Sequence, residues 1–259
     1  SFDQKLEDEF TPAQLSLKIL EKLKNFSENI DKAVITVPAM FANNARQATI
    51  DAAKMAGLSG YESDVVELIN EPTAAIFHYA NLPGVSISGK VMVVDLGGGT
   101  FDVTIAEVNG KKVDVIHSEG NPNLGGKDFD RILLEFMSNQ YKEQLGAELS
   151  IEDVEYLLQA EELKKVLSSR ESHGIILDGP NGPSKKIEIS RKQFNDLSIN
   201  LIEAIKLKME SCVRKSKLQK DDITQILLVG GSTRMPCVVD AIKQVMGKAP
   251  TKGVNVDEA

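Results

Sequence analysis

Three consecutive glycines separate two apolar runs in the segment KVMVVDLGGGTFDVTIAEVNG, and an aspartate flanks the triplet on each side. Glycine leaves backbone amides unshielded, so successive N–H groups of such a turn can point toward one phosphate. The turn consists of Gly97, Gly98, Gly99 and Thr100. Asp95, at the end of the first run, could hold a hydrated Mg²⁺, which prefers few carboxylates together with water and phosphate. The alternative is a simple hairpin bend, where glycine and aspartate are also common.

A second glycine pair follows the apolar run in ILLVGGSTRMP. Gly230 and Gly231 would let a flat ligand such as a nucleoside lie against the backbone, and Arg234 could stack on its base. Ser232 and Thr233 are residue types that cap helices, so we expect them to begin the next helix. An ordinary strand-to-helix turn is the alternative interpretation.

A third candidate is the acid in LINEPTAA, where a strand meets a helix that has Pro72 in its first turn. A carboxylate at Glu71 would be held at the helix start and could accept a hydrogen bond from a metal-bound or attacking water. A helix-capping acid without chemistry is the alternative.

Alternating strand and helix patterns surround these three stretches and must position them. Helices are predicted at 12–25, 43–57, 71–80, 128–145, 150–169, 191–216 and after residue 234. Strands are predicted at 32–39, 64–70, 90–96, 101–108, 111–120, 173–179, 185–190 and 222–229. Strand–helix units combined with antiparallel hairpins are typical of an α/β protein with mixed sheets.

Composition narrows the function classes. The 259 residues carry a net charge of −8, with a pI near 5.1, which argues against a general nucleic-acid or membrane-surface binder. No apolar run is long enough for a transmembrane helix, and residues 1–10 lack the pattern of a signal peptide. Cys212 and Cys237 lack metal-ligand spacing, so a reducing compartment and structural thiols are expected.

Seven short motifs, taken together in their residues and their order along the chain, are more specific than any of the three stretches alone. They are VITVPA, RQAT, INEPTAA, DLGGGTFDVTI, NLGGKDFD, LKKVLSS and LLVGGSTRMP. Together they resemble the ATPase domain of the 70-kilodalton heat-shock protein chaperones, the DnaK-type family within the actin and sugar-kinase superfamily. The resemblance covers residues 11–259 and implies an actin-like (ribonuclease H-like) ATPase fold with two lobes and mixed sheets. It implies these divisions: 1–10, remnant of upper lobe I; 11–88, lower lobe I; 89–123 and 199–259, lower lobe II; 124–198, upper lobe II.

The resemblance also implies a role for each matching residue. The phosphate loop would be Gly97, Gly98, Gly99 and Thr100. The catalytic residues would be Glu71, Asp95, Thr100 and Asp102, with Asp95 and Glu71 holding Mg²⁺ through water. Ribose and adenine would be gripped by Glu161, Lys164, Lys165 and Ser168 on one helix, and the adenosine loop would contain Gly230, Gly231, Ser232 and Arg234. Pro38 and Arg46 would relay the nucleotide state between lobes. The cofactors implied are ATP or ADP and Mg²⁺, with K⁺ as a further candidate.

In such a chaperone, Mg-ATP binding and hydrolysis are coupled to the binding of unfolded polypeptides by a C-terminal domain outside this sequence. The family's first phosphate loop and catalytic lysine would lie upstream of Ser1, so we expect weak or no hydrolysis from this chain alone. A nucleotide-exchange factor would bind lobe II. Glu67 stands where the family usually has an arginine used by J-domain co-chaperones, which disfavours that partner. The implied compartment is the cytoplasm, the mitochondrial matrix or the plastid stroma.

Two other function classes stay open. The first is a non-catalytic, chaperone-like scaffold or regulatory relative with a vestigial nucleotide pocket. Glu67 favours it, as does Lys127, which replaces the usual acid in NLGGKDFD, whereas Asp95, Asp102 and Glu71 oppose it. The second is a sugar kinase, which is disfavoured because the INEPTAA and GGSTRMP motifs resemble those of the chaperones and not those of a sugar site.

Overall fold

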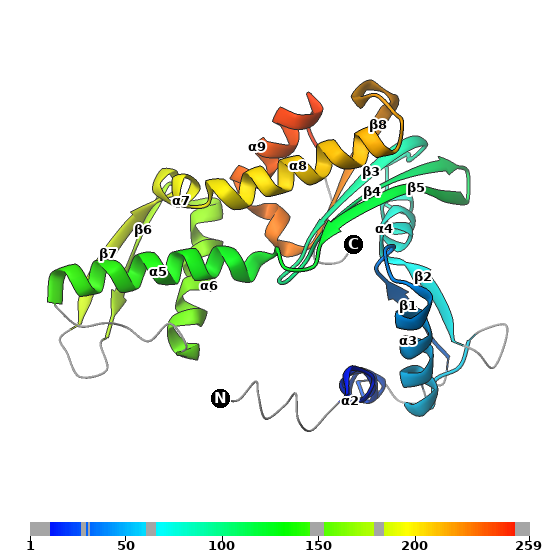
Figure 1. The fold of residues 1–259 in the computed structure, drawn as a ribbon, viewed down its shortest axis with the longest axis horizontal. Helices are drawn as coiled ribbons and strands as arrows, with labels where there is room; N and C mark the ends of the chain where they lie inside the picture. Colours follow the sequence, from blue (N-terminus) through cyan, green and yellow to red (C-terminus); the bar gives the residue numbers. More distant parts are fainter. Residues whose placement is uncertain are drawn as a thin grey trace. The chain divides into compact units, whose positions relative to one another are not determined.

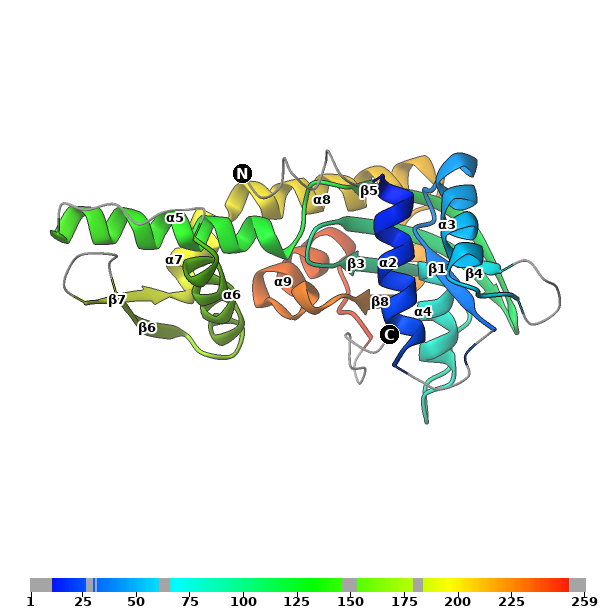
Figure 2. The same cartoon turned by 90° about the horizontal axis from the view of Figure 1, so that it is seen from below.

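The structure is a computed structural model that describes residues 11–26, 30, 32–60, 66–145, 153–178 and 184–251. The chain divides into two compact units, Ser1–Ala74 and Ala75–Ala259. Figures 1 and 2 show the ribbon from two directions. No helix within the described ranges has the length and apolar character that crossing a membrane requires.

The first unit contains a parallel strand pair and two helices that pack together. Its elements are α2 (Pro12–Lys24), β1 (Val34–Val37), α3 (Asn43–Met55) and β2 (Glu67–Asn70). α2 begins as predicted, with Thr11 and Gln14 forming a capping box and Pro12 in its first turn. The α2 leucines that pack against the core are Leu17 and Leu20.

The predicted apolar stripe of α2 is only partly buried. The spacing of Leu15, Ile19, Leu20 and Leu23 predicts an apolar stripe along the helix, but Leu15, Ile19 and Leu23 are exposed. An amphipathic pattern predicts that a helix has an apolar face, but tertiary packing determines which residues of that face are buried.

A four-stranded mixed sheet forms the centre of the second unit. Its strands, in the order β5-β4-β3-β8, are β5 (Lys112–Asn121), β4 (Phe101–Asn109), β3 (Gly89–Leu96) and β8 (Ile223–Val229). β3 pairs antiparallel with β4, as β4 does with β5, whereas β3 and β8 are parallel. The predicted hairpin, its third antiparallel strand and the mixed character of the sheet are therefore confirmed.

Helices cover both faces of this sheet (Figure 1). α8 (Ile199–Lys215) and α9 (Pro236–Met246) pack on the face that carries Met92 and Val94. The other face carries Val91 and Val93, which pack against the part of α4 (Glu71–Ala80) that belongs to this unit. Alternate residues of a strand point to opposite faces, so a strand covered on both sides has the continuous apolar run seen in β3.

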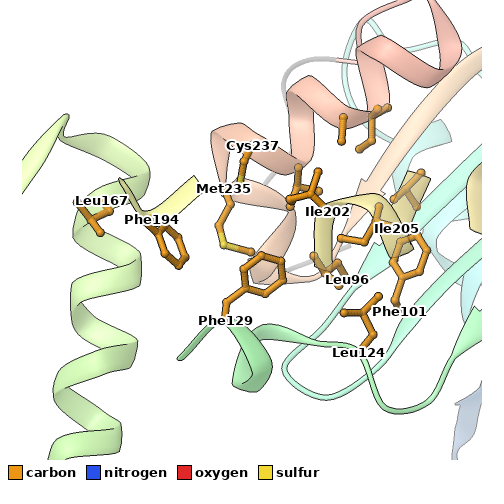
Figure 3. Close-up of a cluster of buried hydrophobic side chains, with 14 of the residues drawn as sticks. Leu96, Phe101, Leu124, Phe129, Leu167, Phe194, Ile202, Ile205, Met235 and Cys237 are labelled. Carbon is orange, nitrogen blue, oxygen red and sulfur yellow. The ribbon is translucent and has the colours of Figure 1, made fainter. Parts of the chain in front are cut away.

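The rest of the second unit continues the same hydrophobic core. It contains α5 (Gly126–Leu145), α6 (Val154–Ser169), the antiparallel pair β6 (Ser172–Leu177) and β7 (Lys185–Ser190), and α7 (Arg191–Leu197). Figure 3 shows side chains of the sheet, such as Leu96 and Phe101, in one cluster with Phe129 of α5 and Phe194 of α7. This shared core holds α5 and α6 against the sheet.

Two helix predictions were wrong in detail. Residues 191–216 form α7 and α8 rather than one helix, because Ser198 leaves helical geometry (φ −89°, ψ 5°) and serine is an indifferent helix former. α7 packs on β7 while α8 packs on β4 and β5, so the break lets each helix follow its own sheet. In α6, the spacing of Val154, Leu157, Leu158 and Leu163 predicts one buried face; Leu163 is buried, whereas Val154 and Leu158 are exposed. Ile151, predicted with them, lies outside the described residues.

Candidate functional site

Three glycine-containing segments meet at the end of the mixed sheet. They are the β3–β4 turn, the glycine pair at the start of α5, and the glycine pair after β8. The amide of Gly126 donates to the carbonyl oxygen of Gly97 (2.9 Å), and the amide of Lys127 donates to that of Gly98 (2.8 Å). The Ser232 hydroxyl also donates to the Gly97 carbonyl oxygen (3.1 Å). The carbonyl side of the turn is therefore fixed by two neighbouring segments.

Two glycines outside the turn are required by the fold. A Cβ atom at Gly125 would lie 2.5 Å from the N, Cα and C atoms of Gly99. A Cβ atom at Gly230 would lie 2.4 Å from the carbonyl oxygen of Leu96 and 2.9 Å from Oδ1 of Asp95, and Gly230 has φ +83°. Main chain packs directly on main chain at both positions, so no side chain can be accommodated there.

The turn glycines are different, because the fold does not require them. A Cβ atom at Gly98 would have no neighbour within 4 Å, and those at Gly97 and Gly99 would meet atoms only at ordinary contact distances of 3.9 and 3.7 Å. The Gly97 amide donates to the carbonyl oxygen of Thr100 (3.1 Å). Within the described ranges, the amides of Gly98, Gly99 and Thr100 donate no hydrogen bond. Uncovered donors beside open space suit an anionic ligand.

A cavity of about 670 Å³ lies beside this turn, within the size range of about 300–1,000 Å³ typical of small-molecule sites. The predicted nucleotide residues among its lining are Gly98, Glu161, Lys164, Lys165, Ser168, Gly231, Ser232 and Arg234. Lys127, Asp130 and Met235 complete the lining. Gly97, Gly99 and Thr100 belong to the same turn without lining the cavity. The structure thus brings together four stretches that are far apart in the sequence: the β3–β4 turn, the start of α5, α6 and the loop after β8.

α6 places its polar residues on the cavity by burying the adjacent face. That face consists of Tyr156, Ala160, Leu163 and Leu167, at helical spacing. Lys164 is buried, and its Nζ donates to the carbonyl oxygen of Gly126 (3.2 Å) and lies 2.8 and 3.0 Å from the two carboxylate oxygens of Asp130. Burial raises the pKa of Asp130, and the Lys164 ammonium opposes that rise. The pair is therefore a fixed, partly desolvated part of the cavity wall.

The next turn of α6 carries a more exposed pair and a hydroxyl. Lys165 Nζ lies 2.9 Å from Oε1 of Glu161, and this contact lowers the pKa of Glu161 and raises that of Lys165. The Ser168 hydroxyl donates to the carbonyl oxygen of Lys164 (3.1 Å) and can still accept a hydrogen bond. These groups offer both donors and acceptors, as hydroxyl groups of a ribose would require.

Two carboxylates flank the turn at its base. Asp95 and Asp102 are directly opposite each other in the β3–β4 ladder. Burial raises the pKa of Asp95 to about 6, with a smaller contribution from the charge of Asp102, and burial also raises the pKa of Asp102. A pair of carboxylates with this unfavourable electrostatic energy fits a hydrated Mg²⁺, which takes few protein ligands. Among the described residues, no cluster of three or more acidic, histidine or cysteine side chains offers a full protein cage for a metal.

The remaining predicted residues lie in the first unit. Glu71 is the first residue of α4, as predicted. The Arg46 guanidinium donates to the carbonyl oxygens of Pro38 (3.4 Å) and Phe41 (3.0 Å) and to Oδ1 of Asn70 (2.7 Å). Asn70 directly precedes Glu71 in the chain, so Arg46 links the Pro38 loop to the start of α4. The roles of Glu71, Pro38 and Arg46 in nucleotide chemistry stay predictions.

The helix-capping role expected for Ser232 and Thr233 is wrong. Both belong to a short 3₁₀ turn, η2 (Gly231–Arg234), and α9 begins only at Pro236. The Thr233 hydroxyl donates to the carbonyl oxygen of Gly230 (2.7 Å), while the Ser232 hydroxyl is used by the β3–β4 turn. Ser232 therefore connects the two glycine segments rather than starting a helix.

Sequence reasoning missed five residues of the site, among them Lys127 and Met235, which line the cavity. Gly125 and Gly126 pack against the turn, and Asp130 neutralises Lys164. The glycine pair directly before a helix was the available signal, since such pairs mark close backbone approach. Asp130 had no local signal, because its partner lies 34 residues away.

A comparison with protein-family models gives a match over nearly the whole chain. The model described as Hsp70 protein matches residues 2–259.

Proposed function

Because this chain belongs to the Hsp70 family, we propose that it binds an adenine nucleotide with Mg²⁺ in the cavity beside the glycine turn, as part of a chaperone ATPase domain. Members of the family generally bind ATP or ADP with Mg²⁺. The α/β fold with its mixed sheets fits the actin-like ATPase fold of that family. The observation that carries the proposal is the turn itself, whose glycines are unnecessary for the fold and whose amides are uncovered.

The lining of the cavity supports one orientation of the nucleotide. The phosphates would lie at the turn, where the amides of Gly98, Gly99 and Thr100 can donate to their oxygens. The adenosine would lie between the α6 face that carries Ser168 and the loop that carries Arg234, whose guanidinium can stack on a flat base. The presence of a cavity with several basic side chains favours nucleotide binding over a vestigial pocket.

Asp95 would hold the metal through water, and Asp102 would lie beside it. Asp95, whose ionised form is destabilised by burial and by Asp102, gains most from a nearby divalent cation. When bound, Mg²⁺ would supply charge neutralisation at the phosphates. Asp95 and Asp102 would then act as ionised groups that orient metal-bound water, and the turn would keep the phosphate chain in register. K⁺ as a further cation is part of the same proposal.

The finer family properties are proposed on the resemblance. The first is the division into lobes: upper lobe I at 1–10, lower lobe I at 11–88, lower lobe II at 89–123 and 199–259, and upper lobe II at 124–198. The second is the coupling of hydrolysis to unfolded-polypeptide binding by a C-terminal domain. The third is the binding of a nucleotide-exchange factor to lobe II. We also propose that Glu67 disfavours J-domain docking. A reducing compartment fits Cys212 and Cys237, both buried and unbridged.

Isothermal titration calorimetry tests the proposal directly. Mg·ADP is expected to bind with one-to-one stoichiometry, EDTA is expected to weaken that binding, and excess adenosine is expected to compete with it because both would occupy the α6 side of the cavity. Absence of binding at millimolar Mg·ADP, or binding that adenosine cannot displace, would contradict it.

A further inference from the structure

The basic residues of the cavity differ in whether a carboxylate already neutralises them. Lys164 is paired with Asp130, and Lys165 is paired with Glu161. Lys127 is exposed, and its side chain makes no ion pair or hydrogen bond within the described part of the chain. Its ammonium group is therefore available to a ligand without the loss of an internal contact.

The backbone holds Lys127 beside the turn. It is the second residue of α5, and its amide donates to the carbonyl oxygen of Gly98 (2.8 Å). Its Nζ lies 3.7 Å, and its Cε 4.0 Å, from the position that a Cβ atom on Gly99 would occupy. The ammonium thus lies next to the same turn whose amides at Gly98, Gly99 and Thr100 are uncovered.

The charge around the turn explains why a cation is needed there. Asp95 and Asp102 flank the turn, and a phosphate brought to it would be repelled by both carboxylates when they are ionised. Lys127 places one positive charge on the cavity side of the turn, and amide donors alone carry no net charge.

We propose that Lys127 is a specificity-determining residue that binds the anionic end of the ligand, so that affinity increases with the number of phosphates. The inference deepens the proposed function and rests on it. Lys127 would contribute to the binding of ADP and ATP but not to that of adenosine, since the adenosine contacts lie on α6 and on the loop after β8.

A pair of titrations separates this role from a general one. In Lys127→Ala, the Kd for Mg·ADP is expected to rise about tenfold, the low end for a hydrogen bond to a charged group, while the Kd for adenosine stays within about twofold. Lys127→Arg keeps the charge and is expected to retain most of the ADP affinity. Arg131 offers a matched control: it is exposed on the same helix and does not line the cavity, so Arg131→Ala is expected to bind both ligands as the parent does.

The outcomes are decisive in both directions. Equal ADP affinity in Lys127→Ala and the parent would overturn the inference, as would an equal loss for ADP and adenosine. Misfolding would appear in a thermal melt, in which Lys127→Ala is expected to unfold as the parent does because the side chain is exposed.

The failure of the proposed function would look different. If the parent binds no ADP, titration with inorganic pyrophosphate, followed by the amide NMR signals of residues 98–100, still tests Lys127. Shifts in the parent that are lost in Lys127→Ala would support an anion site that depends on Lys127. The absence of shifts in both would overturn the inference together with the proposed function.

Discussion

Replacing Gly98 by alanine tests whether this glycine is required for protein stability or for ligand binding. In the structure, a Cβ atom at this position has no neighbour within 4 Å, and the backbone φ lies outside the left-handed region. The variant should therefore be as stable as the parent, or more stable by about 0.4–1 kcal/mol, because alanine restricts the unfolded chain. A methyl group there would hold a phosphate away from the amides of the turn.

The expected loss in binding follows from those amides. A hydrogen bond to a charged group contributes about 1.5–3 kcal/mol, so the loss of one such bond should raise the Kd for Mg·ADP about 10- to 150-fold. The assay combines urea unfolding with calorimetric titration of Mg·ADP on the same preparation. Gly230→Ala is the matched control, since its Cβ atom would lie 2.4 Å from the Leu96 carbonyl oxygen and its φ is +83°. That variant should lose about 3 kcal/mol of stability or more.

Two results would refute this reasoning. If Gly98→Ala binds Mg·ADP as tightly as the parent, the turn does not contact the phosphates. If Gly98→Ala is destabilised as much as Gly230→Ala, the fold requires glycine at 98 and the open space has no functional meaning.

Three further predictions concern the charged groups. The pKa of Asp95, about 6, lies above its usual value of 3.8, so ionisation of this carboxyl destabilises the metal-free protein as pH rises through that window. Asp95→Asn should therefore stabilise the metal-free protein at pH 7 by up to about 3 kcal/mol in urea unfolding. The same variant should abolish the effect of Mg²⁺ on ADP affinity. In the parent, the effect of Mg²⁺ on ADP affinity should weaken below pH 6, where Asp95 becomes protonated. Lys164→Met leaves the Asp130 carboxylate without its cation and should cost about 3 kcal/mol, whereas the double variant Lys164→Met with Asp130→Leu should recover most of that loss in the same assay. Arg46→Lys keeps the charge but not the planar donor group that bonds the Pro38 carbonyl and its neighbours, so amide hydrogen exchange at 39–41 should accelerate.

Local patterns were sufficient for much of the fold and for the parts of the site that lie within one segment. The hairpin around residues 97–99, the start of α2 after Thr11 and the start of α4 at Glu71 follow from apolar alternation, residue type and proline position within a few residues. The family resemblance supplied Lys164, Lys165 and Ser168, and their spacing of three or four residues agrees with a position on one helical face.

Contacts between distant segments were beyond the sequence patterns. The exposure of Val154 and Leu158 and the break at Ser198 depend on which sheet each helix covers. The contact between Gly125 and Gly99, and the use of Ser232 by the turn instead of a helix, exist only once three segments are packed together. The type of a residue determines which hydrogen bonds its side chain can form, whereas the fold determines which partner lies within hydrogen-bond distance.

The position of bound phosphate tests the central claim most directly. In a crystal structure with Mg·ADP, the account predicts phosphate oxygens within hydrogen-bond distance of the amide nitrogens of Gly98, Gly99 and Thr100, with adenosine against α6. Phosphates bound elsewhere, with the turn at residues 97–100 still uncovered, would contradict it.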